Sequence, residues 1–118
     1  MAYDDLKLEI LDGSHPGEKV LVLDGVLNAQ TAFQFRDSVR QHEAPNVVVD
    51  MTNVRYVDSS GLGVLIGAYV SFERSYRHLL LAGLNDRVWD LFRVCKIDDV
   101  FTRYRTVADA EHMIATHA

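Results

Sequence analysis

The segment Asp58-Ser59-Ser60-Gly61 contains the residues of this sequence that are best suited to a chemical role. A serine at the start of a helix can cap it, because its hydroxyl satisfies a backbone N–H that the helix leaves unpaired. A serine there can also accept a phosphoryl group, which would carry roughly −1.5 to −2 charges at pH 7 and meet the free N–H groups of the helix N-terminus. Asp58 would repel that phosphate, and a partner docked on a neutral hydroxyl would meet a dianion. Both roles can coexist if one serine caps the helix while its neighbour is exposed.

Three glycines follow, at Gly61, Gly63 and Gly67. A glycine inside a helix is less favourable than alanine by about 0.5–1 kcal/mol, so each needs a reason. Tight packing of the helix on a sheet is one reason, and close approach of a partner surface is another. The sequence favours both equally.

Two rival chemistries find less support. A hydrolase built on Ser59 would need a Gly-x-Ser-x-Gly turn and a histidine base with an orienting acid, and the sequence marks out neither. A domain phosphorylated on aspartate could use Asp50, but it would need further acids to bind magnesium, and only Asp24 follows the early strands. The five histidines have no metal-ligand spacing. We therefore expect no enzymatic activity, no metal and no cofactor.

Composition restricts the remaining possibilities. The 118 residues suit one domain, and an apolar content of 48% is enough for a core. A net charge of −5 opposes general binding to nucleic acid or to anionic membrane. No apolar run approaches the length of a membrane span, and the N-terminus lacks the features of a secretory signal. A single cysteine, Cys95, forms no internal disulfide, so we expect a cytoplasmic protein.

Alternating apolar patterns predict the elements that position the serines. Asp24-Gly25 is expected to end the second strand, Asn85 to cap one helix, and Thr106 to cap the last. Cys95 falls on the apolar stripe of the helix after Asn85 and is predicted to be a core residue. The predicted strands are 6–11, 19–23, 47–49, 78–82 and 100–104, and the predicted helices are 31–41, from the serines to about 74, 85–95, and the segment after Thr106. This order predicts an α/β fold with a mostly parallel sheet after an opening pair of strands.

Residues 57–65 (VDSSGLGVL) closely resemble the signature of STAS domains, the anti-sigma factor antagonist family. The resemblance continues through residues 25–28 (GVLN), 48–52 (VVDMT) and 97–101 (IDDVF), and so covers essentially the whole chain. It implies a STAS fold of about five strands with four helices, formed by residues 1–118 as a single STAS domain.

The resemblance also implies a partner switch. An unphosphorylated antagonist of this kind binds an anti-sigma factor that is also a serine kinase, and phosphorylation of the antagonist breaks the complex. The family's acceptor maps to Ser59, with Asp58, Ser60 and Gly61 beside it as partner-binding residues. A metal-dependent serine phosphatase reverses the modification.

One position departs from the family pattern. The aspartate of the family's Gly-x-Leu-Asp segment is matched here by Asn28, so a carboxylate expected near the partner surface is missing. Asparagine is nearly isosteric and also caps helices. Asn28 is therefore either a structural cap or a partner contact.

STAS domains also serve as accessory subunits of transport systems and of stress-sensing assemblies, and this is the alternative function. A pull-down that retrieves a small ATPase of the histidine-kinase type would favour the antagonist, and one that retrieves a transporter ATPase would favour the alternative.

Overall fold

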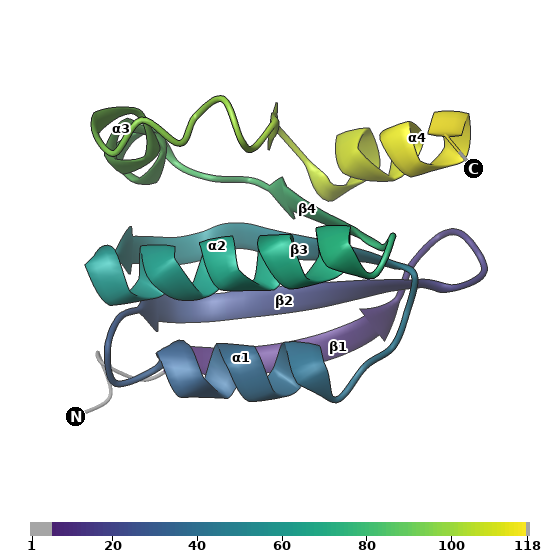
Figure 1. Cartoon of the computed structure of the whole chain (residues 1–118), viewed down its shortest axis with the longest axis horizontal. Helices are drawn as coiled ribbons and strands as arrows, with labels where there is room; N and C mark the ends of the chain where they lie inside the picture. Colours follow the sequence, from purple (N-terminus) through teal and green to yellow (C-terminus); the bar gives the residue numbers. More distant parts are fainter. Residues whose placement is uncertain (1–5, 118) are drawn as a thin grey trace.

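Strands and helices alternate along the chain after an opening pair of strands (Figure 1). The structure is a computed structural model that describes residues 6–117. Its elements are β1 (Leu6–Asp12), β2 (Glu18–Leu27), α1 (Ala32–Arg40), β3 (Asn46–Val57), α2 (Ser59–Arg74), β4 (His78–Ala82), α3 (Asp86–Val94), β5 (Arg103–Tyr104) and α4 (Val107–His117). The predicted order of elements is confirmed.

The strands form one sheet in the order β1-β2-β3-β4-β5. β1 is antiparallel to β2, and every other neighbouring pair is parallel. The mostly parallel sheet predicted from the sequence is therefore confirmed. Leu27 pairs with Val57, so β2 and β3 end side by side, and the loops that follow them leave the sheet at the same edge.

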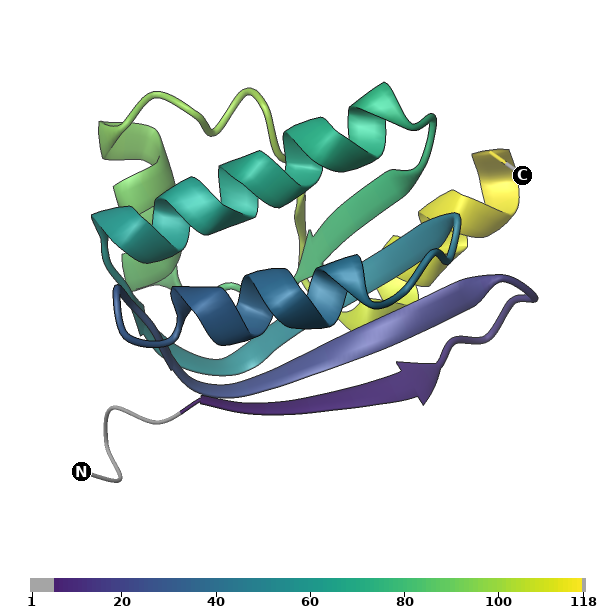
Figure 2. The same ribbon diagram turned by 60° about the horizontal axis from the view of Figure 1, so that its bottom comes forward.

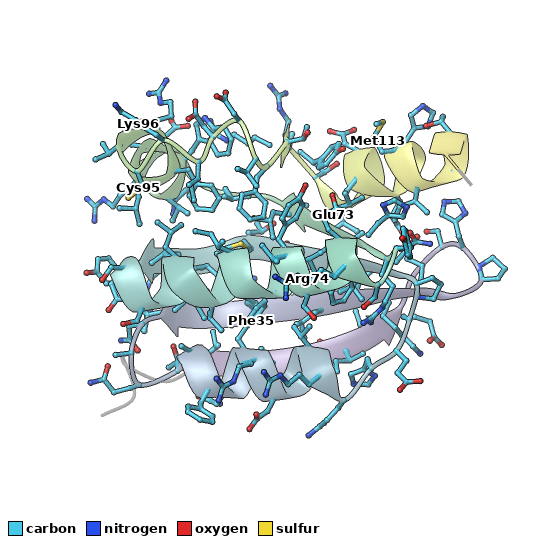
Figure 3. All side chains as sticks on the ribbon, viewed as in Figure 1. Phe35, Glu73, Arg74, Cys95, Lys96 and Met113 are labelled. Carbon is cyan, nitrogen blue, oxygen red and sulfur yellow. The ribbon has the colours of Figure 1, made fainter. Side chains whose placement is uncertain are left out.

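Helices cover both faces of the sheet (Figure 2). α1, α2 and α3 pack on one face over the larger core, which includes Phe35 of α1 and Leu65 of α2 (Figure 3). α4 packs alone on the other face, over a smaller core to which it contributes Ala110 and Ile114. Residues along β3 contribute alternately to the two cores, because successive side chains of a strand point to opposite faces of the sheet.

The second strand is longer than predicted. Asp24 and Gly25 do not end it, and β2 continues to Leu27 through two irregularities in its pairing with β3. Gly25 has a φ of 135°, a conformation that glycine adopts without strain. The turn-forming dipeptide thus produces a bulge inside the strand rather than its end.

Further boundaries differ from the sequence prediction. The third strand, predicted as 47–49, extends from Asn46 to Val57. The last strand is only Arg103–Tyr104. α3 ends at Val94, with Cys95 as its C-cap and Lys96 in a left-handed conformation with φ 60°. Cys95 is exposed at the end of α3, so its predicted place in the core is wrong (Figure 3). Because α3 ends at Val94, its buried residues are Val88 and Phe92, and Cys95 does not continue its apolar face.

Two acidic residues, the buried Glu18 and the half-buried Glu111, join the β1–β2 turn to α4. Glu18 is 2% exposed, and neither of its carboxylate oxygens accepts a hydrogen bond within residues 6–117. The Ser14 N–H donates to Glu111 Oε2 over 2.8 Å. A Cβ on Gly13 would overlap the Glu18 carboxylate, so a larger residue at that position would have to displace this acid.

Candidate functional site

The helix that follows the third strand is capped by Asp58. Asp58 lies in an extended conformation, with φ −100° and ψ −173°, and its Oδ1 accepts from the Gly61 N–H over 2.9 Å. Its carbonyl accepts from the Leu62 N–H over 2.8 Å, as the first bond of the helix. The expectation that one serine caps this helix is therefore wrong. An aspartate oxygen one residue earlier does so, and its negative charge also suits the positive end of the helix dipole.

Ser59 and Ser60 are the first two residues of α2, and both side chains are exposed. Neither hydroxyl makes a hydrogen bond to any other residue within 6–117. The backbone N–H groups at these two positions belong to the first turn, where a helix supplies no acceptor of its own. Both hydroxyls are thus open to an incoming group, beside donors that suit an anion.

Gly61 fixes α2 against the end of β2. A Cβ at this position would overlap the carbonyl oxygen of Leu27. The Asp58 N–H donates to the same oxygen over 3.1 Å. Tight packing, one of the two reasons offered by the sequence, therefore explains Gly61.

Gly63 and Gly67 have a different environment. A Cβ at either position would meet no atom within 4 Å. Packing on the sheet does not explain them.

Asn28 organises the loop between β2 and α1. Its Oδ1 accepts from the N–H groups of Gln30 and Thr31 over 3.0 and 3.1 Å. Its own N–H donates to Thr31 Oγ1 over 2.9 Å, and the Thr31 hydroxyl in turn donates to the Val26 carbonyl over 2.8 Å. Asn28 is only 9% exposed. It is a structural cap of the loop that precedes α1.

The ends of two neighbouring parallel strands bring the predicted site residues together. The segment from Asp58 to Gly61 follows β3, and Asn28 follows β2, with Leu27 in contact with both Asp58 and Gly61. In Figure 1 the N-termini of α1 and α2 lie at this same edge. The site is thus an exposed serine pair on a rigid, hydrogen-bonded base.

This region has one feature that the sequence did not predict. A groove of about 450 Å³ lies between α1 and α2, and Gly63 and Gly67 form part of its wall. Glycines at the fourth and eighth positions after Ser59 were the available signal, because these positions share one face of a helix.

Residues 6–117 hold neither a cluster of metal-ligating side chains nor a helix that could span a membrane. Within residues 6–117, no three histidine, cysteine or acidic side chains gather in a way that could hold a metal ion. The same part of the chain contains no helix with the length and apolar character to cross a membrane.

Known proteins resemble this chain over most of its length. A family model for the STAS domain matches residues 10–110. The anti-sigma-B factor antagonist of Listeria monocytogenes is 34% identical over 79 residues, which cover 64% of this chain and 69% of that protein.

Solved structures share the fold. The crystal structure of an anti-sigma factor antagonist from Mycobacterium paratuberculosis has a TM-score of 0.83 at 20% identity and covers 95% of this chain and 96% of its own. The anti-sigma factor antagonist SpoIIAA in its unphosphorylated form has a TM-score of 0.75 at 17% identity, over 93% and 97% of the two chains.

Proposed function

This chain belongs to the STAS domain family, and from that premise we propose that it is an anti-sigma factor antagonist. We propose that it binds its anti-sigma factor while Ser59 is unphosphorylated and is released when Ser59 is phosphorylated. The Listeria relative, an anti-sigma-B factor antagonist, supports the assignment to this class. The family match over residues 10–110 supports the further proposal that residues 1–118 form one STAS domain.

The observation that carries the proposal is the exposed hydroxyl of Ser59 in the first turn of α2. The oxygen that caps the helix comes from Asp58, so phosphorylation of Ser59 removes no bond that holds the fold. A modification site of this kind can change the surface while leaving the domain folded.

Electrostatics explain why phosphorylation would release a partner. Transfer of the γ-phosphoryl group of ATP to Ser59 Oγ releases ADP and the hydroxyl proton, and replaces a neutral donor by a dianion. The free N–H groups of the first turn stabilise that dianion within the antagonist. The neighbouring Asp58 carboxylate adds negative charge at the same surface. A partner surface complementary to the neutral serine then faces concentrated negative charge.

The other predicted site residues have distinct parts in the proposal. Asp58 and Ser60 flank Ser59 and offer contacts to the partner. Gly61 and Asn28 are buried, so we propose that they serve partner binding by holding the backbone beside Ser59 in place.

The proposal includes the enzymes that would set the switch. The anti-sigma factor would itself be the serine kinase, and a metal-dependent serine phosphatase would hydrolyse the phosphoserine and restore binding. Because an anti-sigma factor acts on transcription, we place the cycle in the cytoplasm.

Binding of substituted proteins tests the proposal. Calorimetric titration with the purified anti-sigma factor of the same organism should give equal affinities for wild type and Ser59→Ala, and at least tenfold weaker binding for Ser59→Asp. Ser60→Asp is the matched control for charge one residue away, and we expect it to weaken binding less. Equal affinity of Ser59→Asp and Ser59→Ala would contradict an electrostatic switch.

Phosphate mapping tests the acceptor directly. After incubation with the kinase and ATP, mass spectrometry should find phosphate at Ser59. Phosphate at Ser60 alone, or no phosphate, would overturn the assignment. Retrieval of a transporter ATPase in place of an anti-sigma factor would favour the alternative of an accessory transport subunit.

A further inference from the structure

The groove between α1 and α2 is open although helix packing would normally fill it. Its walls are made by side chains of α1 and by small residues of α2, and they include Phe33, Arg36, Arg40, Gly63, Gly67 and Ala68. Glycine is less favourable than alanine inside a helix, and a Cβ at Gly63 or Gly67 would meet no atom within 4 Å. The fold alone would accept larger residues here.

The groove lies on the same face of α2 as Ser59. Ser59, Gly63 and Gly67 are spaced by four residues and so lie on one face of α2. All three are exposed. A partner that contacts the Ser59 hydroxyl and extends along the helix would therefore enter the groove.

The charge on the groove is unusual for this acidic chain. Within residues 6–117, neither Arg36 nor Arg40 forms an ion pair, although the whole chain has a net charge of −5. The Nε–H of Arg36 is buried and has no acceptor there. A buried donor without an acceptor is unfavourable, so an occupant that supplies an oxygen would gain binding energy.

An exposed aromatic ring lies beside this guanidinium. Phe33 is 63% exposed, and its ring centre is 4.0 Å from the Arg36 guanidinium carbon. An apolar surface next to an unpaired cation suits a segment that carries an apolar side chain next to a carboxylate.

We propose that the α1–α2 groove is a second contact for the anti-sigma factor, which places there an apolar side chain against Phe33, Gly63 and Gly67 and a carboxylate against Arg36. This inference rests on the proposed function, because it names the same partner. It adds a surface that phosphorylation does not modify and that selects the partner by its charge and shape.

Filling the groove is the first test. Gly67→Leu places a side chain in open space, and leucine is the better helix former, so the variant should fold with a melting temperature at or above that of wild type. We expect at least tenfold weaker binding to the purified anti-sigma factor. Ala115→Leu is the matched control, because it adds a leucine to an exposed position of α4 on the opposite face of the sheet, and it should bind as wild type does.

Reversing the charge is the second test. Arg36→Glu should weaken binding at least tenfold at low salt, and by a smaller factor at high salt, because salt screens the interaction. Arg105→Glu makes the same change of net charge at an exposed position outside the groove and should have little effect.

The outcomes separate this inference from the proposed function. If Ser59→Asp weakens binding but Gly67→Leu binds as wild type does, the groove contact is overturned and the switch stands. If Gly67→Leu weakens binding but Arg36→Glu binds as wild type does, the carboxylate contact is overturned. If wild type itself does not bind the anti-sigma factor, both proposals fall. A wild-type dimer in sedimentation that Gly67→Leu abolishes would assign the groove to a second copy of this chain and overturn the proposal.

Discussion

The carboxyl group of Glu18 in β2 lies beside the carboxyl group of Glu111 in α4, where the β1–β2 turn meets the last helix. Burial raises the pKa of Glu18 to about 7, and the neighbouring carboxyl group of Glu111 adds to this rise. The neighbouring carboxyl group of Glu18 in turn lowers the pKa of Glu111, aided by the Ser14 N–H and by the nearby His15. The two acids therefore hold one proton between them at mildly acidic pH.

The shared proton makes stability depend on pH. Glu18 has a higher pKa when folded than when unfolded, so its contribution is fully present below pH 4.5 and is lost as pH rises to about 7. Glu111, with a lowered pKa, has the opposite effect and loses its contribution as pH falls below 4.5. We expect the free energy of unfolding, measured by urea denaturation, to decline between about pH 5 and pH 7.

Glu18→Gln should remove this decline. An amide donates to the Glu111 carboxylate without ionising, so we expect a gain of about 1–2 kcal/mol at pH 8 and little change at pH 5. Glu9→Gln, at an exposed position of β1, is the control and should retain the wild-type profile. A Glu18→Gln profile that still declines from pH 5 to pH 7 would show that another group is responsible.

The cap of α2 can be separated from the charge of Asp58. Asp58→Ala removes the acceptor of the Gly61 N–H and should lower the free energy of unfolding by about 0.5–2 kcal/mol. Asp58→Asn keeps an oxygen there and should remain close to wild type. Equal losses in the two variants would mean that the charge, and not the cap, stabilises the helix.

Two glycines of the same helix should respond in opposite ways to alanine. Gly61→Ala forces a Cβ against the Leu27 carbonyl and should destabilise the protein by about 1–3 kcal/mol. Gly63→Ala enters open space and should stabilise it by about 0.5–1 kcal/mol. Thermal denaturation of both variants measures the contrast. A destabilised Gly63→Ala protein would indicate that the groove is closed in solution.

The loop at Asn28 should tolerate the family's aspartate. Asn28→Asp retains the oxygen that accepts from Gln30 and Thr31, so the stability should stay within about 1 kcal/mol of wild type. Asn28→Ala leaves those N–H groups without their acceptor and should be destabilised by about 1–3 kcal/mol. Gln30→Ala, at an exposed position, is the control for truncation in this loop.

Local patterns predicted the order of elements but not every boundary. The alternation in β1 and the helical spacing in α1 and α2 were sufficient because each reflects burial against a single face. The prediction that Asp24-Gly25 ends the second strand was wrong because a turn-forming pair can also form a bulge when it is paired with neighbouring strands. The prediction that Cys95 lies in the core was wrong because α3 ends one residue before it. The left-handed conformation of Lys96, which follows, has no signature in the sequence.

The site was predicted as a segment but not as a surface. The sequence placed Ser59 at a helix start, whereas the choice of Asp58 as the cap depends on backbone angles that residue type does not fix. The groove could not be predicted because it forms only when α1 and α2 lie side by side. Arg36 lines it together with residues of α2 that are about thirty residues away in sequence. Such relationships arise from tertiary packing.

The placement of α4 alone on its face of the sheet has a consequence for where the molecule can be altered. Its small core and the turn around Glu18 hold it, while α1 and α2 share the larger core with α3. The C-terminal helix lies on the face of the sheet opposite α1 and α2. We therefore expect that a sequence fused or altered at that end would leave the Ser59 face, and with it the proposed switch, intact.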